Sequence, residues 1–156
     1  MLSPERIEKL MGKCISAAYK HGEGVCKPYA GAIVLGKDEE EILGIGIKSL
    51  LGGSLGLTIH AERDALVRAG RKANGGTLIT TLEPCVRIPG KRTILKSCAE
   101  FILESGIKRV VIGMQDPTFT LKGKGISYLK QNRIETMLYK GPQGEEIRKL
   151  FHRYLY

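Results

Sequence analysis

Four residues of the chain have the types and spacing needed for metal chemistry. His60 is followed two positions later by Glu62, and the cysteines Cys85 and Cys98 come further along the chain. A catalytic zinc site takes three protein ligands and keeps a fourth position for water, and one imidazole with two thiolates meets that count. We therefore predict that His60, Cys85 and Cys98 bind Zn²⁺, with Glu62 as an acid-base residue beside them.

The segments around these residues indicate where in a fold they lie. A helical spacing of apolar residues begins at His60. The β-rich segment 77–82 ends shortly before Cys85, and segment 97–100 has the capping-box pattern that starts a helix, which places Cys98 at the first helical position. Positive helix starts favour a thiolate and a neutral imidazole, the forms that bind metal. We expect the ligands to meet near a strand end and two helix starts.

The rest of the chain predicts the scaffold from the same periodicities. Further helices are expected at residues 4–18, 126–131 and 145–156, and strands at 30–36, 42–47, 110–114 and 134–139. The first two strands should form an antiparallel hairpin, and strand 110–114 should run parallel to its predecessor because a helix separates them. The order predicts a three-layer α/β domain with a five-stranded mixed sheet, whose ligands bind beyond the carboxyl ends of strands.

Composition bounds the class of protein. A length of 156 residues with 42% hydrophobic content suits one domain, residues 1–156, with a core of its own. Segments 51–56 and 86–96 are predicted loops. The absence of a secretory segment or a long apolar stretch predicts no membrane span, reduced thiols and a cytoplasmic location.

Some residues that could bind metal have simpler interpretations. Cys14 falls on the apolar face of the first helix and is expected in the core. Cys26 lies in a loop, and burial is the favoured interpretation for it as well. His21 and His152 have no second donor at ligand spacing, so surface positions are expected for both.

The combination of His-x-Glu, Pro-Cys and a further cysteine favours a particular reaction. This is the ligand-and-base pattern of zinc deaminases, hydrolases that remove the exocyclic amine of a heterocyclic base. The alternative is a non-catalytic zinc module that binds nucleic acid. Glu62 argues against that alternative, because a closed structural site needs a fourth protein ligand and no charged base.

The sequence resembles the cytidine deaminase superfamily and, within it, is most similar to the pyrimidine deaminase of riboflavin biosynthesis. The resemblance covers most of residues 5–135 and is carried by segments 60–66, 81–85, 106–112 and 114–117. It implies the cytidine-deaminase-like α-β-α fold, the same zinc ligands, a ribosylaminopyrimidine phosphate as substrate, and homo-oligomers, either dimers or tetramers.

Three features depart from that family. Twelve residues separate Cys85 from Cys98, more than the family has. The additional length lies in segment 86–96, the basic loop. Lys27-Pro28 stands where the family has asparagine-proline before the first strand. The riboflavin enzyme often continues into a reductase domain, whereas this chain ends at Tyr156. Substrate choice is therefore expected to depend on the basic loop and on residues 27–31.

The formal charge of +9 predicts an anionic partner. Arg87, Lys91 and Arg92 are candidates for binding a substrate phosphate, with Asp116 at a strand end as a further substrate contact. Two alternatives stay open: solvated loop charge, and a cytosine or adenine deaminase acting on nucleotides or nucleic acid. Aromatic residues make up only 6% of the chain and tryptophan is absent, which gives little material for an extended base-stacking surface.

Overall fold

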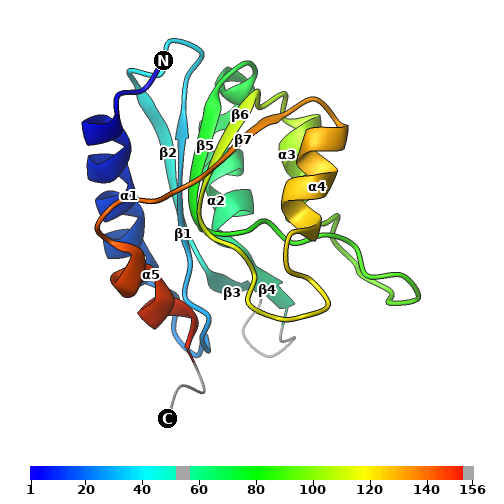
Figure 1. The fold of residues 1–156 in the computed structure, drawn as a ribbon. Coiled ribbons are helices and arrows are strands. Elements are labelled where there is room, and N and C mark those ends of the chain that lie inside the picture. The colour runs from blue at the N-terminus through cyan, green and yellow to red at the C-terminus, as the bar shows by residue number, and fades with distance from the viewer. Residues whose placement is uncertain (52–56, 153–156) are drawn as a thin grey trace.

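A five-stranded sheet between two layers of helices forms the body of the molecule (Figure 1). The computed structural model describes residues 1–51 and 57–152. The helices are α1 (Pro4–Ala18), α2 (Ala61–Ala69), α3 (Cys98–Glu104), α4 (Lys124–Gln131), α5 (Gly144–Phe151) and the short 3₁₀ helix η2 (Gly70–Ala73). The strands are β1 (Gly31–Leu35), β2 (Ile42–Ile47), β3 (Ser49–Leu51), β4 (Leu57–Ile59), β5 (Thr77–Leu82), β6 (Arg109–Met114) and β7 (Glu135–Leu138).

The strand order of the main sheet is β2-β1-β5-β6-β7. Strand β1 pairs antiparallel with β2 and with β5, whereas β5, β6 and β7 run parallel to one another. The predicted three-layer fold, its hairpin and its mixed five-stranded sheet are confirmed. The carboxyl ends of β5 and β6 consequently meet at one edge of the sheet, where ligand sites of open α/β sheets form.

Each face of the sheet has its own apolar core. Helices α1 and α5 cover one face, and α2, α3 and α4 cover the other (Figure 1). Successive side chains of β1 alternate between the cores, with Ile33 buried against α1 and Val34 buried on the α2 side. Cys14 is fully buried in the α1 core, as predicted.

Two glycines of β2 allow helix α2 to lie directly on the strand. A Cβ atom added to Gly44 would be 2.4 Å from the carbonyl oxygen of Ala65, and one added to Gly46 would be 2.0 Å from that of Ala61. Real Cβ atoms do not approach a carbonyl oxygen so closely. These glycines therefore set the distance between the sheet and the helix whose N-cap is His60.

We expect Gly46→Ala to displace the start of α2 and to destabilise the fold by about 2 kcal/mol or more, because backbone stands where the methyl group must go. Gly36→Ala is the matched control, since a Cβ there meets its nearest atom at 3.5 Å. Urea unfolding of the two variants measures the difference. Equal stability of Gly46→Ala and Gly36→Ala would contradict this account of how α2 is placed.

Several details differ from the sequence predictions. Strands β3 and β4 were not predicted; they pair as a separate two-stranded sheet just before His60. Three-residue strands are too short to show a hydrophobic period. Of the loop predicted at 51–56, Leu51 belongs to β3, and residues 52–56 lie outside the described part of the chain. The 3₁₀ helix η2, which follows α2, was not predicted either.

The predicted burial of Cys26 is wrong, because this cysteine is exposed. Its neighbour Val25 takes the buried position in that loop. His21 is half-buried, with its ring stacked on Tyr29 at a centroid distance of 3.9 Å.

The last helix ends at Phe151 rather than at the predicted residue 156. The backbone of His152, which is half-buried, is already extended, and residues 153–156 lie outside the described part. No described helix has the length and apolar character required to cross a bilayer.

Candidate active site

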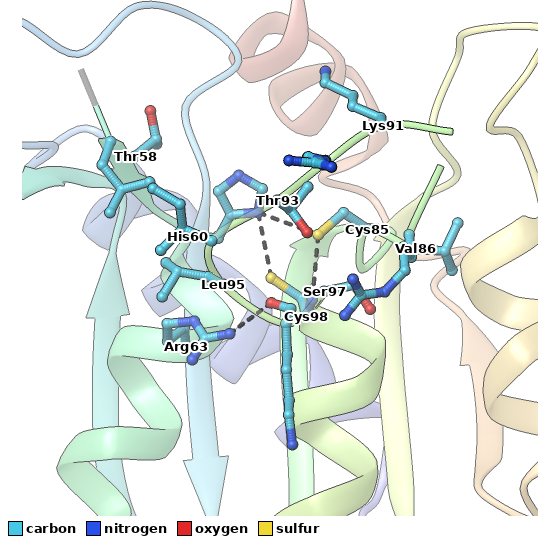
Figure 2. Close-up of a pocket in the computed structure, with 15 residues that line it drawn as sticks. Thr58, His60, Arg63, Cys85, Val86, Lys91, Thr93, Leu95, Ser97 and Cys98 are labelled. Carbon is cyan, nitrogen blue, oxygen red and sulfur yellow. Dashed lines mark hydrogen bonds between the residues drawn. The ribbon is translucent and has the colours of Figure 1, made fainter. Parts of the chain in front are cut away.

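His60, Cys85 and Cys98 converge at the predicted edge of the sheet (Figure 2). One ligand atom from each side chain lies within 4.8 Å of the others. The Nδ1 atom of His60 faces both sulfurs, at 3.5 Å from Cys85 Sγ and 3.3 Å from Cys98 Sγ. Two sulfurs and one imidazole nitrogen thus surround one point, which is the donor set of a catalytic zinc site.

Local structure places each of these donors. His60 is the N-cap of α2, and Cys98 is the first residue of α3, as predicted. Ser97 and Glu100 form the predicted capping box, in which the Ser97 hydroxyl accepts from the Glu100 amide at 3.2 Å and the Glu100 carboxylate accepts from the Ser97 amide at 2.8 Å. The start of α3 is fixed by its own sequence for this reason.

The start of α3 also binds Cys85. The Cys98 amide donates to Cys85 Sγ at 3.2 Å, and the Ala99 amide donates to the Cys85 carbonyl at 3.0 Å. A helix N-terminus is the positive end of its dipole and stabilises an adjacent negative charge. The arrangement therefore prepares Cys85 for the thiolate form.

Hydrogen bonds to Cys85 lower the pKa of its thiol to about 4, first through the Cys98 side chain and then through His60 and the Cys98 amide. The same pairing and its burial hold the pKa of Cys98 well above the usual range. The pKa of His60 is raised by its hydrogen bond to Cys85. These directions favour one thiolate over two in the cluster, and a cation between the sulfurs would stabilise the second. These donors fit Zn²⁺.

Glu62 lies in the first turn of α2 and is buried on the side of that helix that faces the sheet, with 4% of its surface exposed. The hydroxyl of Thr80 on β5 donates to Glu62 Oε1 at 3.1 Å. Burial raises the pKa of Glu62, while the charge of His60 acts in the opposite direction. A carboxyl group that is shielded from solvent beside a metal-type donor set is suited to proton transfer.

A cavity of about 470 Å³ opens in front of the three donors. The side chains of His60, Cys85 and Cys98 line its inner end, and residues of the basic loop form much of its wall (Figure 2). Arg63 from the first turn of α2 also lines it and donates to the Lys96 carbonyl at 2.6 Å. The cavity is large enough for a heterocyclic base with a substituent.

The basic side chains of the loop differ in their availability. Arg87 lines the cavity, but its guanidinium makes two hydrogen bonds of 3.2 Å each to the Glu100 carboxylate. Lys96 pairs with Glu104. Lys91 and Arg92 also line the cavity and are exposed, and neither has a side-chain partner among residues 1–51 and 57–152. An anion in the cavity would therefore meet Lys91 and Arg92 as its available cations.

Other predicted substrate contacts lie outside the cavity wall. Asp116 lines a separate small recess behind Cys85, and its Oδ1 accepts hydrogen bonds from the Thr118 amide and hydroxyl at 2.8 and 2.6 Å. Lys27 donates to the Lys149 carbonyl at 3.2 Å, on the α5 side. Among the described residues, none of 27–31 lines the cavity. A substrate contact by Asp116 stays a prediction.

Sequence reasoning missed two residues of the site. Thr80 is two residues after Leu78 on β5 and so faces the same core as Leu78. A hydroxyl group at a core position among apolar residues could have indicated it from the sequence. Arg63 donates a hydrogen bond to the carbonyl of Lys96, at the end of the basic loop, and its guanidinium lies 4.3 Å from the Phe101 ring centroid. Its contacts are with residues distant in sequence, so no local pattern indicated them.

A three-layer α/β domain with a His-Cys-Cys donor set at the sheet edge and a buried glutamate beside it defines the class of zinc-dependent base deaminases. The chain belongs to the family of the cytidine and deoxycytidylate deaminase zinc-binding region, whose model matches residues 4–114. The predicted resemblance is confirmed. Zinc is the cofactor that this family uses, and the donor set found here fits it.

The relatives include enzymes of riboflavin biosynthesis. The riboflavin biosynthesis protein RibD of Bacillus amyloliquefaciens is 39% identical over 152 residues, which cover 95% of this chain and 38% of that protein. The diaminohydroxyphosphoribosylamino-pyrimidine deaminase of Buchnera aphidicola subsp. Schizaphis graminum is 36% identical over 111 residues, covering 71% of this chain and 68% of that one. The chain spans about two fifths of the length of the RibD relative.

Solved structures agree with the fold. The deaminase/reductase of Thermotoga maritima superposes with a TM-score of 0.75 at 34% identity, covering 95% of this chain and 40% of that protein. The dCMP deaminase of cyanophage S-TIM5 superposes with a TM-score of 0.65 at 23% identity, covering 88% and 100% of the two chains, which supports the fold alone.

Proposed function

We propose that residues 1–156 form one zinc-dependent deaminase domain that removes the exocyclic amine of a pyrimidine-type base by hydrolysis. The substrate proposed is a ribosylaminopyrimidine phosphate of riboflavin biosynthesis, because the relatives with that named activity are similar to most of this chain. The observation that carries the proposal is the convergence of His60, Cys85 and Cys98 within 4.8 Å, with the buried Glu62 behind them.

The residues divide the work as follows. His60, Cys85 and Cys98 would hold Zn²⁺, which when bound supplies Lewis-acid activation of water. Glu62 accepts one proton of the attacking water and delivers it to the ring nitrogen. It then accepts the second proton from the hydroxyl group added to the ring and passes it to the amine, which leaves as ammonia while the carbonyl group forms. The cavity wall excludes bulk water and orients the ring so that its amine-bearing carbon faces the donors.

An ammonia-release screen tests the proposal with zinc-loaded protein. The substrates are the riboflavin-pathway diaminopyrimidine phosphate, free bases, nucleotides, and single-stranded DNA and RNA. Release from the diaminopyrimidine phosphate in preference to the others is the expected result. Absence of zinc from protein purified without chelator, or release from polymers alone, would overturn it.

We place the phosphate of the substrate against Lys91 and Arg92. Replacing either by alanine should raise KM by about 10–100-fold with little change in kcat, because a hydrogen bond to a charged group is worth about 1.5–3 kcal/mol. Arg87→Ala should have a smaller effect, since Glu100 already holds that guanidinium. Lys130→Ala, which removes an exposed cation on α4, is the control. Steady-state kinetics in which Arg87→Ala and Arg92→Ala raise KM equally would contradict the assignment.

A second candidate function is deamination of cytosine or adenine in nucleotides or nucleic acid. The formal charge of +9 and the basic loop at the cavity favour an extended anionic substrate as well. Binding of single-stranded RNA measured against salt concentration separates the two. A steep loss of affinity with salt favours the polymer, whereas weak binding with a shallow slope favours the small phosphate.

The proposal includes an oligomeric state and a cellular compartment. We expect a homo-oligomer, either a dimer or a tetramer, which sedimentation analysis would test. All four cysteines are free, as in a reducing compartment, and we place the reaction in the cytoplasm. A non-catalytic zinc module is the less favoured function, because the three donors leave a coordination position open beside a carboxylate.

A further inference from the structure

Thr80 is the residue directly behind Glu62. Its side chain is fully buried on β5, on the face of the sheet that α2 covers. The hydroxyl oxygen lies 3.1 Å from Glu62 Oε1. Neither Thr80 nor Glu62 is among the described residues that line the cavity, and this hydrogen bond is what links Thr80 to the acid-base residue.

The same hydroxyl has a second acceptor in reach. Thr80 Oγ1 lies 3.1 Å from the carbonyl oxygen of Leu82 and 3.4 Å from the Leu82 amide nitrogen. A hydroxyl carries one hydrogen and accepts through its lone pairs. Thr80 can therefore donate to Glu62 or to the Leu82 carbonyl at any one time, but not to both.

Both contacts are made from one buried position on β5. The Thr80 hydroxyl lies between the Glu62 carboxyl group on α2 and the backbone of Leu82 at the end of the strand. The strand therefore fixes the point at which the Glu62 side chain meets a hydrogen-bond partner.

We propose that Thr80 is a positioning residue that holds the carboxyl group of Glu62 in place during deamination. The inference rests on the proposed function, in which Glu62 takes up and returns a proton in every turnover. A carboxyl group buried to this degree needs a hydrogen-bond partner, since an unmatched polar atom in a dry site is costly. The Thr80 hydroxyl supplies that partner, and its own place is fixed by the strand and by the Leu82 backbone.

Thr80→Val tests the proposal, because valine keeps the shape of threonine and removes the hydroxyl. We expect kcat to fall by about 10–100-fold, the loss of one hydrogen bond to a charged group, with KM within about threefold of the wild type. Zinc content and the visible spectrum of the Co²⁺-substituted protein should be unchanged, since the metal donors are untouched. Thr80→Ser should restore kcat to within about threefold, and Thr80→Ala should show the same loss as valine.

Thr81→Val is the matched control. Thr81 is the next residue on β5, is equally buried, and faces the other side of the sheet, where its hydroxyl accepts from the Gly31 amide at 3.2 Å. It should keep the wild-type kcat. Wild-type kcat in Thr80→Val, or an equal loss in Thr81→Val, would overturn the proposal.

A crystal structure of zinc-loaded Thr80→Val gives a readout that does not depend on substrate. A Glu62 carboxyl group displaced or disordered relative to the wild type supports the positioning role, and an unmoved one overturns it. If the wild-type protein releases ammonia from no compound in the screen, the proposed function fails. The position of Glu62 in the Thr80→Val crystal structure still decides whether Thr80 positions it.

Discussion

Replacing Glu62 by glutamine is expected to lower kcat by about 10²–10⁴-fold while the protein keeps its fold and its zinc. The amide is nearly the same size as the carboxyl group, but it cannot accept the proton of the attacking water or pass it to the ring. Zinc binding should persist because Glu62 is outside the donor set. Substrate affinity should change little because the glutamine amide keeps the size of the side chain and can still form hydrogen bonds, so that the loss falls on kcat.

The stability of this variant provides an independent check. Burial raises the pKa of Glu62, which means that the folded protein disfavours its ionised form. Glutamine removes that charge, so thermal unfolding should occur at the wild-type temperature or above it. Single-turnover kinetics, zinc analysis and calorimetry are the measurements, with Glu104→Gln on the exposed surface of α3 as control. Wild-type turnover by Glu62→Gln would exclude Glu62 as the acid-base residue.

The predictions that the structure confirms rest on local signals. The start of α3 was predicted from Ser97 and Glu100, whose capping box is closed by residues three positions apart. The parallel placement of β6 followed from a run of apolar residues after a helix. A capping box and an apolar run each depend on neighbouring residues only, so the sequence is sufficient to locate them.

What the sequence could not provide is the pairing of distant side chains. Arg87 was predicted as a phosphate ligand, but Glu100, thirteen residues away, occupies its guanidinium. Thr80 contacts Glu62 across the space between the sheet and a helix, and Arg63 contacts the far end of the basic loop. Cys26 was predicted to be buried from residue type alone, and Val25 took that position. Such outcomes depend on three-dimensional packing rather than on spacing.

Removing one of the metal donors is expected to have an effect as large as replacing Glu62. Cys98→Ser should reduce zinc affinity by more than the roughly 10–100-fold that loss of an outer hydrogen bond to a metal ligand causes, because a first ligand is removed. A serine hydroxyl does not ionise near neutral pH and does not replace a thiolate as a zinc ligand.

The consequence for stability follows from mass action. Zinc at a thousand times its Kd stabilises the folded state by about 4.1 kcal/mol, and a hundredfold weaker site at the same concentration retains only about 1.4 kcal/mol. The difference of about 2.7 kcal/mol should appear as a lower unfolding temperature with zinc present. It should vanish in chelator, because pairing with Cys85 and burial raise the pKa of Cys98 and so favour an uncharged thiol in the metal-free protein, and serine is uncharged and close to cysteine in size.

Cys26→Ser separates this effect from a general sensitivity to loss of a thiol. Cys26 is exposed and is not part of the donor cluster, so its variant should unfold like the wild type with and without chelator. Unfolding of Cys98→Ser at the wild-type temperature in the presence of zinc would remove Cys98 from the ligand set. A variant equally destabilised with and without chelator would make Cys98 a packing residue alone. The zinc-dependent difference between Cys98→Ser and Cys26→Ser is therefore the quantity that distinguishes a ligand from a buried cysteine.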